Sequence, residues 1–387
     1  MYARVRWVRH GENASAGPPL YHNWKGSGNS LFPIYLSGTK VYCTVAAEEA
    51  QSMADYEIFE LREVVLQSGL TLRQAKLVYK TYGELNPARD NVIVMPTFYG
   101  AQHAENEVMM AAWRALDPKH YFIVVPNMFG NGLSSSPSNT PPPFDRAAFP
   151  NVTLYDNVVC QHRLLTEHLG VERIRLVVGF SMGAQQTFQW GALYPDMVQA
   201  IAPICGSART SPHNSVFLEG VKAALVADAA FAEGWYQTPP VKGLQAFSRV
   251  YAGWVFSQDF FREQEYRKMG LASPEDSVRF LEGYFRRRDA NDLLAMLWTW
   301  QHADISANQV YKGDFAAALK AIRARAIVMP GTTDLYFRVR DNELEVEQMP
   351  NAELRPIPSI WGHVAGLGIN PPDNAFIDAA LQELLAG

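Results

Sequence analysis

One five-residue segment limits the folds open to this chain more than any other feature. Gly-Phe-Ser-Met-Gly, residues 179–183, follows an apolar run over 174–178 and precedes a helical pattern that continues to Tyr194. A serine placed between a buried strand and a helix can occupy a strained turn that exposes its Oγ. Strand and helix then approach closely, so the positions two residues to either side must be small, and both are glycine. The segment predicts a strand–turn–helix unit with Ser181 as the candidate nucleophile.

Apolar runs alternate with helical patterns on both sides of this segment. Four further runs have the length of strands, at residues 91–96, 121–126, 198–205 and 324–330. Continuous apolar runs are typical of parallel strands buried on both faces, with helices as crossover connections. Ahead of them, residues 56–61 and 63–67 predict a pair of strands, and residues 105–116 predict a helix. We therefore expect an α/β fold with a mostly parallel sheet flanked by helices.

Two stretches depart from this alternation. Residues 206–305 show helical patterns separated by Gly and Pro, with no strand-like run, so we expect a helical cap inserted between two core segments, 53–205 and 306–387. Residues 1–52 show no sustained period, and we expect a disordered extension or a start upstream of the natural one. Residues 8–12 match the phosphohistidine motif of histidine phosphatases. The domain that such chemistry requires does not follow, which favours coincidence.

Composition excludes several classes of function. The formal net charge is −5, and the longest run of like charge is the arginine triplet 286–288, so a nucleic-acid partner is not expected. No stretch of 18 apolar residues is present, so a membrane span is not expected. Three cysteines without ligand spacing give neither a disulfide framework nor a metal site. We expect a cytoplasmic protein with no metal and no cofactor.

The strand–turn–helix unit also predicts where the partners of the serine lie. In this arrangement an acid and then a histidine follow the nucleophile along the chain, each in a loop after a strand. Asp334 follows the run 324–330, and His363 follows a last strand expected over 354–358 and precedes a C-terminal helix. The rival acids are Asp304 and Asp341. We expect His363 to take the proton of Ser181 while Asp334 fixes its tautomer.

An acyl-transfer site also needs two backbone N–H groups to hold the oxyanion. The first should belong to Met182, directly after the nucleophile, and the second to the loop after the run 91–96. Phe98 is the preferred donor in that loop, and Tyr99 is the alternative. His103 and His302 are candidate pocket residues.

Together with Thr153–Asp156, Gln161, Trp190 and the segment Gly206-Ser-Ala-Arg, these motifs resemble the homoserine O-acetyltransferase family of α/β-hydrolases, which includes esterase-like members. The resemblance runs from about residue 56 to the C-terminus. It implies an α/β-hydrolase fold with a helical cap, an acyl-serine intermediate, no metal, and a homodimer formed through the cap.

The departures from the family pattern bear on the acyl acceptor. Phe180 replaces a glycine before the nucleophile, Lys222 stands where transacetylases carry an arginine for the homoserine carboxylate, and Val364 replaces an aspartate after the histidine. An apolar residue cannot hold an ammonium group, and lysine is a poor substitute for bidentate arginine. The binding groups for an amino acid are therefore missing, whereas the acyl chemistry is retained.

These observations predict a serine hydrolase that cleaves short-chain, acetate-type esters through an acyl-Ser181 intermediate. The partner would be a small-molecule ester. The alternative is homoserine O-acetyltransferase or a related acyl-CoA-dependent O-acyltransferase, with acetyl-CoA as co-substrate. A binding protein that uses only the cap is disfavoured, because Ser181, Asp334 and His363 are all retained.

Overall fold

The computed structural model describes residues 33–36, 39–42 and 55–386. The chain divides into two units, Met1–Ala54 and Asp55–Gly387. In the first unit, β1 (Pro33–Leu36) and β2 (Thr39–Tyr42) pair as antiparallel strands. The motif match at 8–12 and most of the expected extension over 1–52 lie outside the described residues, so both interpretations stay predictions. The boundaries at 53, 206 and 305 stay predictions as well.

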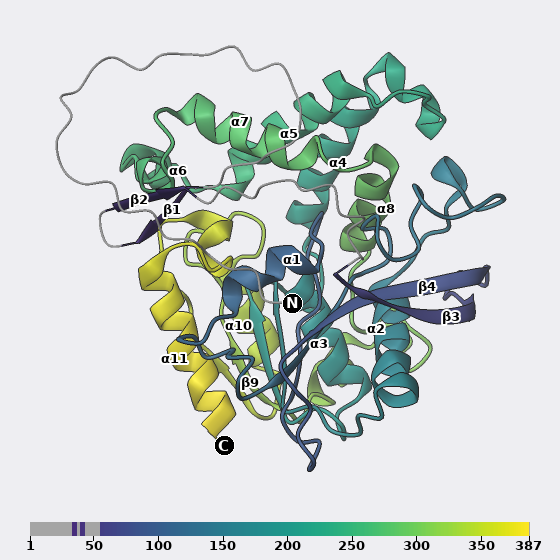
Figure 1. Cartoon of the computed structure of the whole chain (residues 1–387), viewed down its shortest axis with the longest axis vertical. Coiled ribbons are helices and arrows are strands. Elements are labelled where there is room, and N and C mark those ends of the chain that lie inside the picture. Colours follow the sequence, from purple (N-terminus) through teal and green to yellow (C-terminus); the bar gives the residue numbers. More distant parts are fainter. Residues whose placement is uncertain (1–32, 37–38, 43–54, 387) are drawn as a thin grey trace. The chain divides into compact units, whose positions relative to one another are not determined.

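The second unit is built on an eight-stranded sheet (Figure 1). Its strands are β3 (Glu57–Val65), β4 (Thr71–Tyr82), β5 (Val92–Val94), β6 (Phe122–Pro126), β7 (Leu176–Phe180), β8 (Ala200–Ile204), β9 (Arg325–Val328) and β10 (Ala352–Leu354). The spatial order is β10-β9-β8-β7-β5-β6-β4-β3. All neighbours from β10 to β6 are parallel, whereas β4 is antiparallel to both β6 and β3. The expected mostly parallel sheet is confirmed.

Alternate residues of the central strands enter two separate apolar cores. Val92 and Val94 of β5 belong to the core that α2 (Leu154–Arg163) and α3 (Met182–Leu193) complete on one face. Ile93 belongs to the core on the other face, which includes α11 (Pro371–Ala386). Burial of both faces explains the unbroken apolar runs in the sequence. The remaining core helices are α1 (His103–Asn106), α9 (Phe315–Lys320) and α10 (Val339–Val346).

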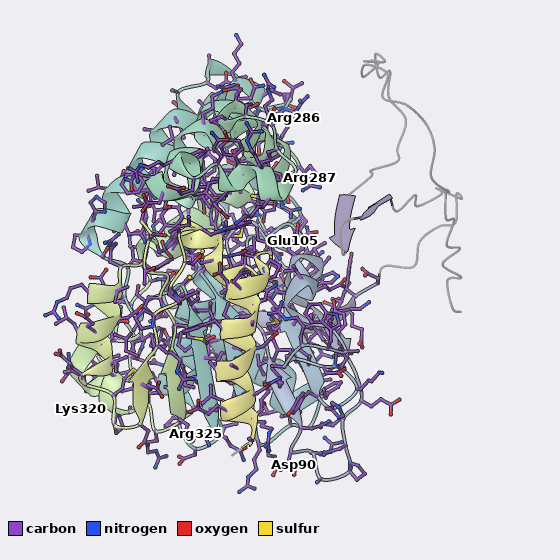
Figure 2. The ribbon with its side chains drawn as sticks, turned by 90° about the vertical axis from the view of Figure 1, so that its left-hand side faces the viewer. Asp90, Glu105, Arg286, Arg287, Lys320 and Arg325 are labelled. Atoms are coloured by element: carbon purple, nitrogen blue, oxygen red, sulfur yellow. The ribbon has the colours of Figure 1, made fainter. Side chains whose placement is uncertain are left out.

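The stretch between β8 and α9 forms a group of helices over one end of the sheet. They are α4 (Pro212–Val226), α5 (Val241–Val255), α6 (Gln258–Arg262), α7 (Pro274–Phe285) and α8 (Ala290–Gln301). Figure 2 shows Arg286 and Arg287 at this end of the molecule and Asp90 and Arg325 at the other. Arg325 begins β9, so the helices cover the carboxyl ends of the parallel strands. No helix in the described part of the chain is long and apolar enough to cross a membrane.

Three expected elements differ from the structure. The last strand, expected over 354–358, is β10 at Ala352–Leu354, so most of the expected range lies beyond it. Residues 57–61 and 63–65 lie in a single strand, β3, whose pairing register with β4 shifts on both sides of Arg62. Arg62 has φ 60°, so it forms a bulge that continues the strand. The helix expected over 105–116 ends at Asn106 and is followed by a 3₁₀ turn, Glu107–Met109. Beyond that turn, Arg114 Nε pairs with Asp378 Oδ2 of α11 at 2.9 Å, which fixes the segment in a non-helical path.

Candidate active site

The turn between β7 and α3 places Ser181 in a strained backbone conformation. Its φ is 58° and its ψ is −123°, which is uncommon for a residue other than glycine. A Cβ on Gly179 would lie 2.2 Å from the backbone of Gly183, and a Cβ on Gly183 would lie 2.7 Å from Pro96 O. The flanking glycines are therefore required by the close approach of strand, helix and the loop after β5, as the sequence predicts.

The three residues singled out for nucleophile, base and acid lie in one hydrogen-bonded chain. His363 Nε2 is 2.9 Å from Ser181 Oγ, and His363 Nδ1 is 2.7 Å from Asp334 Oδ2. All three are buried. The other carboxylate oxygen, Asp334 Oδ1, accepts the backbone N–H groups of Tyr336 at 2.8 Å and Phe337 at 3.2 Å. These two bonds fix the carboxylate so that it faces the imidazole.

The rival acids lie elsewhere. Asp304 Oδ2 pairs with Arg209 Nε at 2.7 Å, and its Oδ1 accepts the hydroxyl of Ser306. Asp341 lies in the first turn of α10.

With Nδ1–H donated to Asp334, the Nε2 of His363 is free to accept the serine proton. The arrangement can therefore generate a nucleophilic Oγ and return the proton to a leaving group.

The loop after β5 lies against the start of α3. Gln186 Nε2 donates to Thr97 O at 2.9 Å, and Thr97 Oγ1 accepts the backbone N–H of Met128 at 3.0 Å. Among the described residues, the backbone N–H groups of Met182 and Phe98 have no hydrogen-bond acceptor. Their availability suits the role that the sequence predicts for them, although that role stays a prediction.

Tyr99, the alternative donor, has its side chain in the interface between core and cap. Its ring is buried and stacks on Tyr251, with ring centroids 6.0 Å apart, and its hydroxyl donates to Leu293 O at 3.0 Å. The residue therefore ties the loop after β5 to α8 of the cap.

Aromatic side chains surround the imidazole of His363. The ring centroid of Phe180 lies 4.7 Å from it, that of Tyr336 4.8 Å and that of Phe337 5.6 Å. Phe180 also meets Phe98 edge to face at 5.1 Å, and Val364 is buried next to the histidine in sequence. Phe180 therefore packs on the imidazole, whereas the substrate-pocket roles of Phe180 and Val364 stay predictions. Tyr336 and Phe337 were not anticipated, although their places directly after the candidate acid were a usable signal.

A buried thiol lies behind the site. Cys205 directly follows β8, and its Sγ would contact a Cβ on Gly331 or on Gly366, which lie in the loops of the acid and the histidine. Burial, and then the nearby Asp334 carboxylate, raise the pKa of the Cys205 thiol well above its usual range. It therefore stays a neutral thiol and fills space rather than competing as a nucleophile.

Two expected pocket residues lie away from the site. Lys222 is on the exposed face of α4, with its Nζ 3.5 Å from Glu219 Oε1, and its predicted pocket role is therefore wrong. The neighbouring Val221 is the buried residue, because successive helix positions are about 100° apart. The imidazole of His103 is bonded to Asn127 and Asp55, each at 3.3 Å, and not to the triad residues.

The family model described as "alpha/beta hydrolase fold" matches residues 91–362. The chain belongs to the α/β-hydrolase family. It is 39% identical over 335 residues to the ethyl acetate hydrolase of Pseudomonas veronii, covering 86% of this chain and 95% of that protein. It is 30% identical over 336 residues to the homoserine O-acetyltransferase of Chlorobium chlorochromatii, covering 83% and 93%.

A solved structure agrees with this assignment. The acetylester hydrolase of Corynebacterium glutamicum superposes with a TM-score of 0.83 at 37% identity, covering 86% of this chain and 96% of that chain. The α/β-hydrolase has esterases and homoserine O-acetyltransferases among its relatives, so the resemblance deduced from the motifs is confirmed.

Proposed function

We propose that this α/β-hydrolase cleaves short-chain, acetate-type esters through an acyl-Ser181 intermediate, with His363 as base and Asp334 as its orienting acid. The observation that carries the proposal is the continuous hydrogen-bonded chain from Ser181 Oγ through the imidazole to Asp334, set on a strained turn. His363 takes the Oγ proton as the ester carbonyl is attacked, and later gives it to the leaving alcohol. Water then attacks the acyl-enzyme by the same route.

The oxyanion of each tetrahedral intermediate would be held by the N–H groups of Met182 and Phe98. Met182 is the first residue of α3, so its N–H has no acceptor inside the helix and benefits from the positive end of the helix dipole. Phe98 follows the segment that Gln186 and Asn106 hold against the helix, through bonds to Thr97 O and Pro96 O. Removal of one such donor typically costs about 100- to 1000-fold in rate.

The acyl class follows from the relatives and from the surroundings of the imidazole. The relatives reported above are named as hydrolases of ethyl acetate and of acetyl esters. Phe180, Tyr336 and Phe337 pack directly around His363, so the surroundings of the imidazole are apolar. Such walls suit a neutral ester with a short acyl chain better than a zwitterion.

The acyl acceptor is water in this proposal. Homoserine carries an ammonium and a carboxylate group, and each would need a charged partner on entering a buried site. Val364 is apolar and buried, and Lys222 lies on the outer face of the cap. The alternative, an acetyl-CoA-dependent homoserine O-acetyltransferase, rests on the relatives with that name at 30% identity.

One assay separates the two functions. The enzyme is incubated with p-nitrophenyl acetate with and without homoserine, and separately with acetyl-CoA and homoserine. Fast hydrolysis that homoserine does not change supports the esterase. Formation of acetylhomoserine from acetyl-CoA would refute it.

The nucleophile is tested by Ser181→Ala. Loss of the Oγ should lower kcat by several orders of magnitude, because base and acid then have no nucleophile to activate. The variant should keep the thermal transition of the wild type. Turnover near the wild-type rate would contradict the whole mechanism.

We also propose that the protein is a cytoplasmic homodimer joined through the cap. Several apolar side chains of the cap are exposed, among them Val216 (71%), Phe280 (50%) and Trp235 (48%). Covering them in a partner subunit would remove apolar surface from water. Cys160 and Cys205 are free thiols, as a reducing compartment requires. Sedimentation of the wild type and of Val216→Asp tests the dimer, and the variant should be monomeric.

A further inference from the structure

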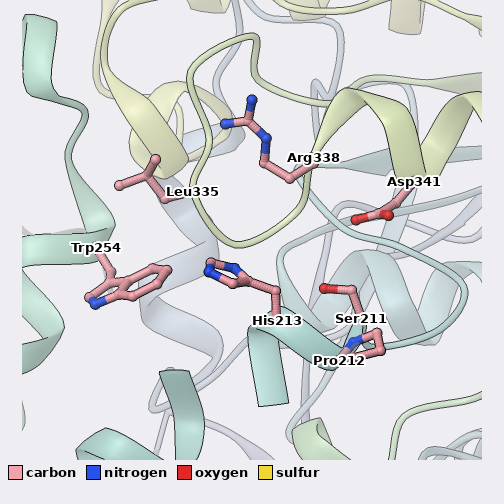
Figure 3. A pocket seen from close by; sticks show the side chains of 7 residues that line it. All are labelled: Ser211, Pro212, His213, Trp254, Leu335, Arg338 and Asp341. Atoms are coloured by element: carbon pink, nitrogen blue, oxygen red, sulfur yellow. The ribbon is translucent and has the colours of Figure 1, made fainter. Parts of the chain in front are cut away.

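A cavity of about 460 Å³ lies between the cap and the core, apart from Ser181 and His363 (Figure 3). The cap contributes residues at the start of α4 and near the end of α5, and the core contributes residues around the start of α10. The lining residues are Ser211, Pro212, His213, Trp254, Leu335, Arg338 and Asp341. A volume of this size is typical of small-molecule sites.

Packed aromatic rings separate the cavity from the catalytic histidine. Trp254 contacts Phe217 with centroids 4.8 Å apart, Phe217 contacts Tyr336 at 4.9 Å, and Tyr336 contacts His363 at 4.8 Å. Tyr336 is only 1% exposed, so its ring fills the space between Phe217 and His363. A ligand in the cavity would therefore not touch Ser181, and the cavity is a second place for a ligand.

The cavity has an apolar wall and also the guanidinium of Arg338, which has unused hydrogen-bond donors. Figure 3 shows Trp254 and Leu335 on one side of His213, and Ser211 and Asp341 on the other. Arg338 makes one side-chain hydrogen bond, from Nη1 to Asp334 O at 2.9 Å, and no carboxylate within the described ranges forms an ion pair with it. Most of its five N–H donors are thus available to a ligand.

Asp341, in the first turn of α10, is the one acidic residue of the lining. Burial raises the pKa of the Asp341 carboxyl above its usual range, and the backbone N–H of Arg338 and the side chains of Arg338 and His213 offset this effect only in part. The carboxyl is therefore protonated more easily than an exposed aspartate, which weakens its repulsion of a bound anion. In Figure 3 the carboxylate of Asp341 and the guanidinium of Arg338 extend in different directions, and the guanidinium stays free to face an incoming anion.

We propose that this cavity binds a small organic carboxylate with an aromatic or branched hydrocarbon part. The carboxylate pairs with the guanidinium of Arg338, which suits it because the planar fork matches two carboxylate oxygens. The hydrocarbon part packs on Trp254 and Leu335. Because Arg338 also holds the backbone of Asp334, the ligand contacts the turn that carries the catalytic acid without entering the active site. The cavity is thus placed as an effector site.

The proposal is tested by calorimetric titration of the full-length protein with phenylacetate. Ser181 is first blocked with diethyl p-nitrophenyl phosphate, so that binding at the active site does not contribute, and mass spectrometry reports the adduct. Phenylacetate should bind about tenfold or more tightly than phenylacetamide, which has the same shape without the charge. If the adduct does not form, the proposed function is at fault, and the titration is repeated on Ser181→Ala.

Variants assign the binding to the cavity. Arg338→Met should weaken phenylacetate binding about tenfold or more, and Trp254→Ala should weaken it independently through the apolar end. Arg340→Met is the matched control, because Arg340 is exposed on the same helix and pairs with Glu343 outside the cavity. Circular dichroism shows that each variant is folded. Equal binding of acid and amide, preferential binding of phenethylamine, no binding at all, or an unchanged affinity in folded Arg338→Met and Trp254→Ala would each overturn the proposal.

Discussion

Replacing Gly183 by alanine tests how closely the loop after β5 must approach the nucleophile. The new Cβ would lie 2.7 Å from Pro96 O, whereas ordinary van der Waals contact begins at 3.4 Å. Since the obstacle is backbone, the loop or the helix must move by roughly 0.7 Å to restore a normal contact. Pro96 is two residues before Phe98, so the shift reaches the proposed oxyanion donor.

The expected consequence is a selective loss of rate. A displacement approaching 1 Å at a catalytic group can cost on the order of 100-fold, so kcat on p-nitrophenyl acetate should fall by about 10- to 100-fold. The steric strain should also lower the free energy of unfolding by about 1–3 kcal/mol. Both quantities are measured on the purified variant, by steady-state kinetics and by urea denaturation.

Gly191→Ala is the matched control. Gly191 is buried in the same helix, α3, but its Cβ would first meet the side-chain atom Ile322 Cγ2 at 3.1 Å, far along the helix from the loop. This variant should lose some stability and keep its kcat. A wild-type kcat in Gly183→Ala, or the same loss of kcat in both variants, would refute the reasoning.

Three further predictions concern buried polar groups. Asp334→Asn should lower kcat by about 10³- to 10⁴-fold with little change in thermal stability, because an amide in place of the carboxylate no longer fixes the tautomer of His363. Stopped-flow hydrolysis measures this loss of kcat. Burial raises the pKa of Glu345 to about 8 from 4.5, so this residue's contribution to stability is present below pH 4.5 and is lost as pH rises to about 8. The stability of Glu345→Gln relative to the wild type should therefore increase over that range, by at most about 5 kcal/mol, in urea titrations at successive pH values. Tyr99→Phe removes the bond to Leu293 O and should cost about 0.5–1.5 kcal/mol of unfolding free energy, whereas no change would show that the bond adds nothing.

Most of the site could be predicted because its determinants are local or follow from chain order. The turn at Ser181 needs a glycine two positions to either side, and these residues all lie within the five-residue segment 179–183. Parallel strands end at one edge of the sheet, so loops after β9 and β10 had to bring Asp334 and His363 to the edge where β7 ends. The capping box of α2, in which Thr153 and Asp156 bond each other's backbone N–H groups, is likewise a local signal.

The predictions that failed depend on one residue of helix register or on a contact between segments far apart in the chain. The sequence placed Lys222 in the pocket, but packing of α4 against α5 and α8 turns Val221 inward and leaves the lysine in water. His103 could equally have faced the site, and bonds to Asn127 and Asp55 hold it elsewhere. The path after Asn106 depends on the ion pair between Arg114 and α11, more than 250 residues away in the chain.

By itself, the sequence determined the fold class and the family, and it singled out Ser181, Asp334 and His363 as one group, because apolar runs, glycine spacing and chain order are properties of the chain alone. Only the tertiary structure decided which aromatic rings surround His363, which residues of the cap face inward, and that a cavity beside Arg338 lies apart from Ser181. These features arise where cap and core meet. Their geometry depends on side chains from distant segments filling the same space, and no pattern within one segment encodes it.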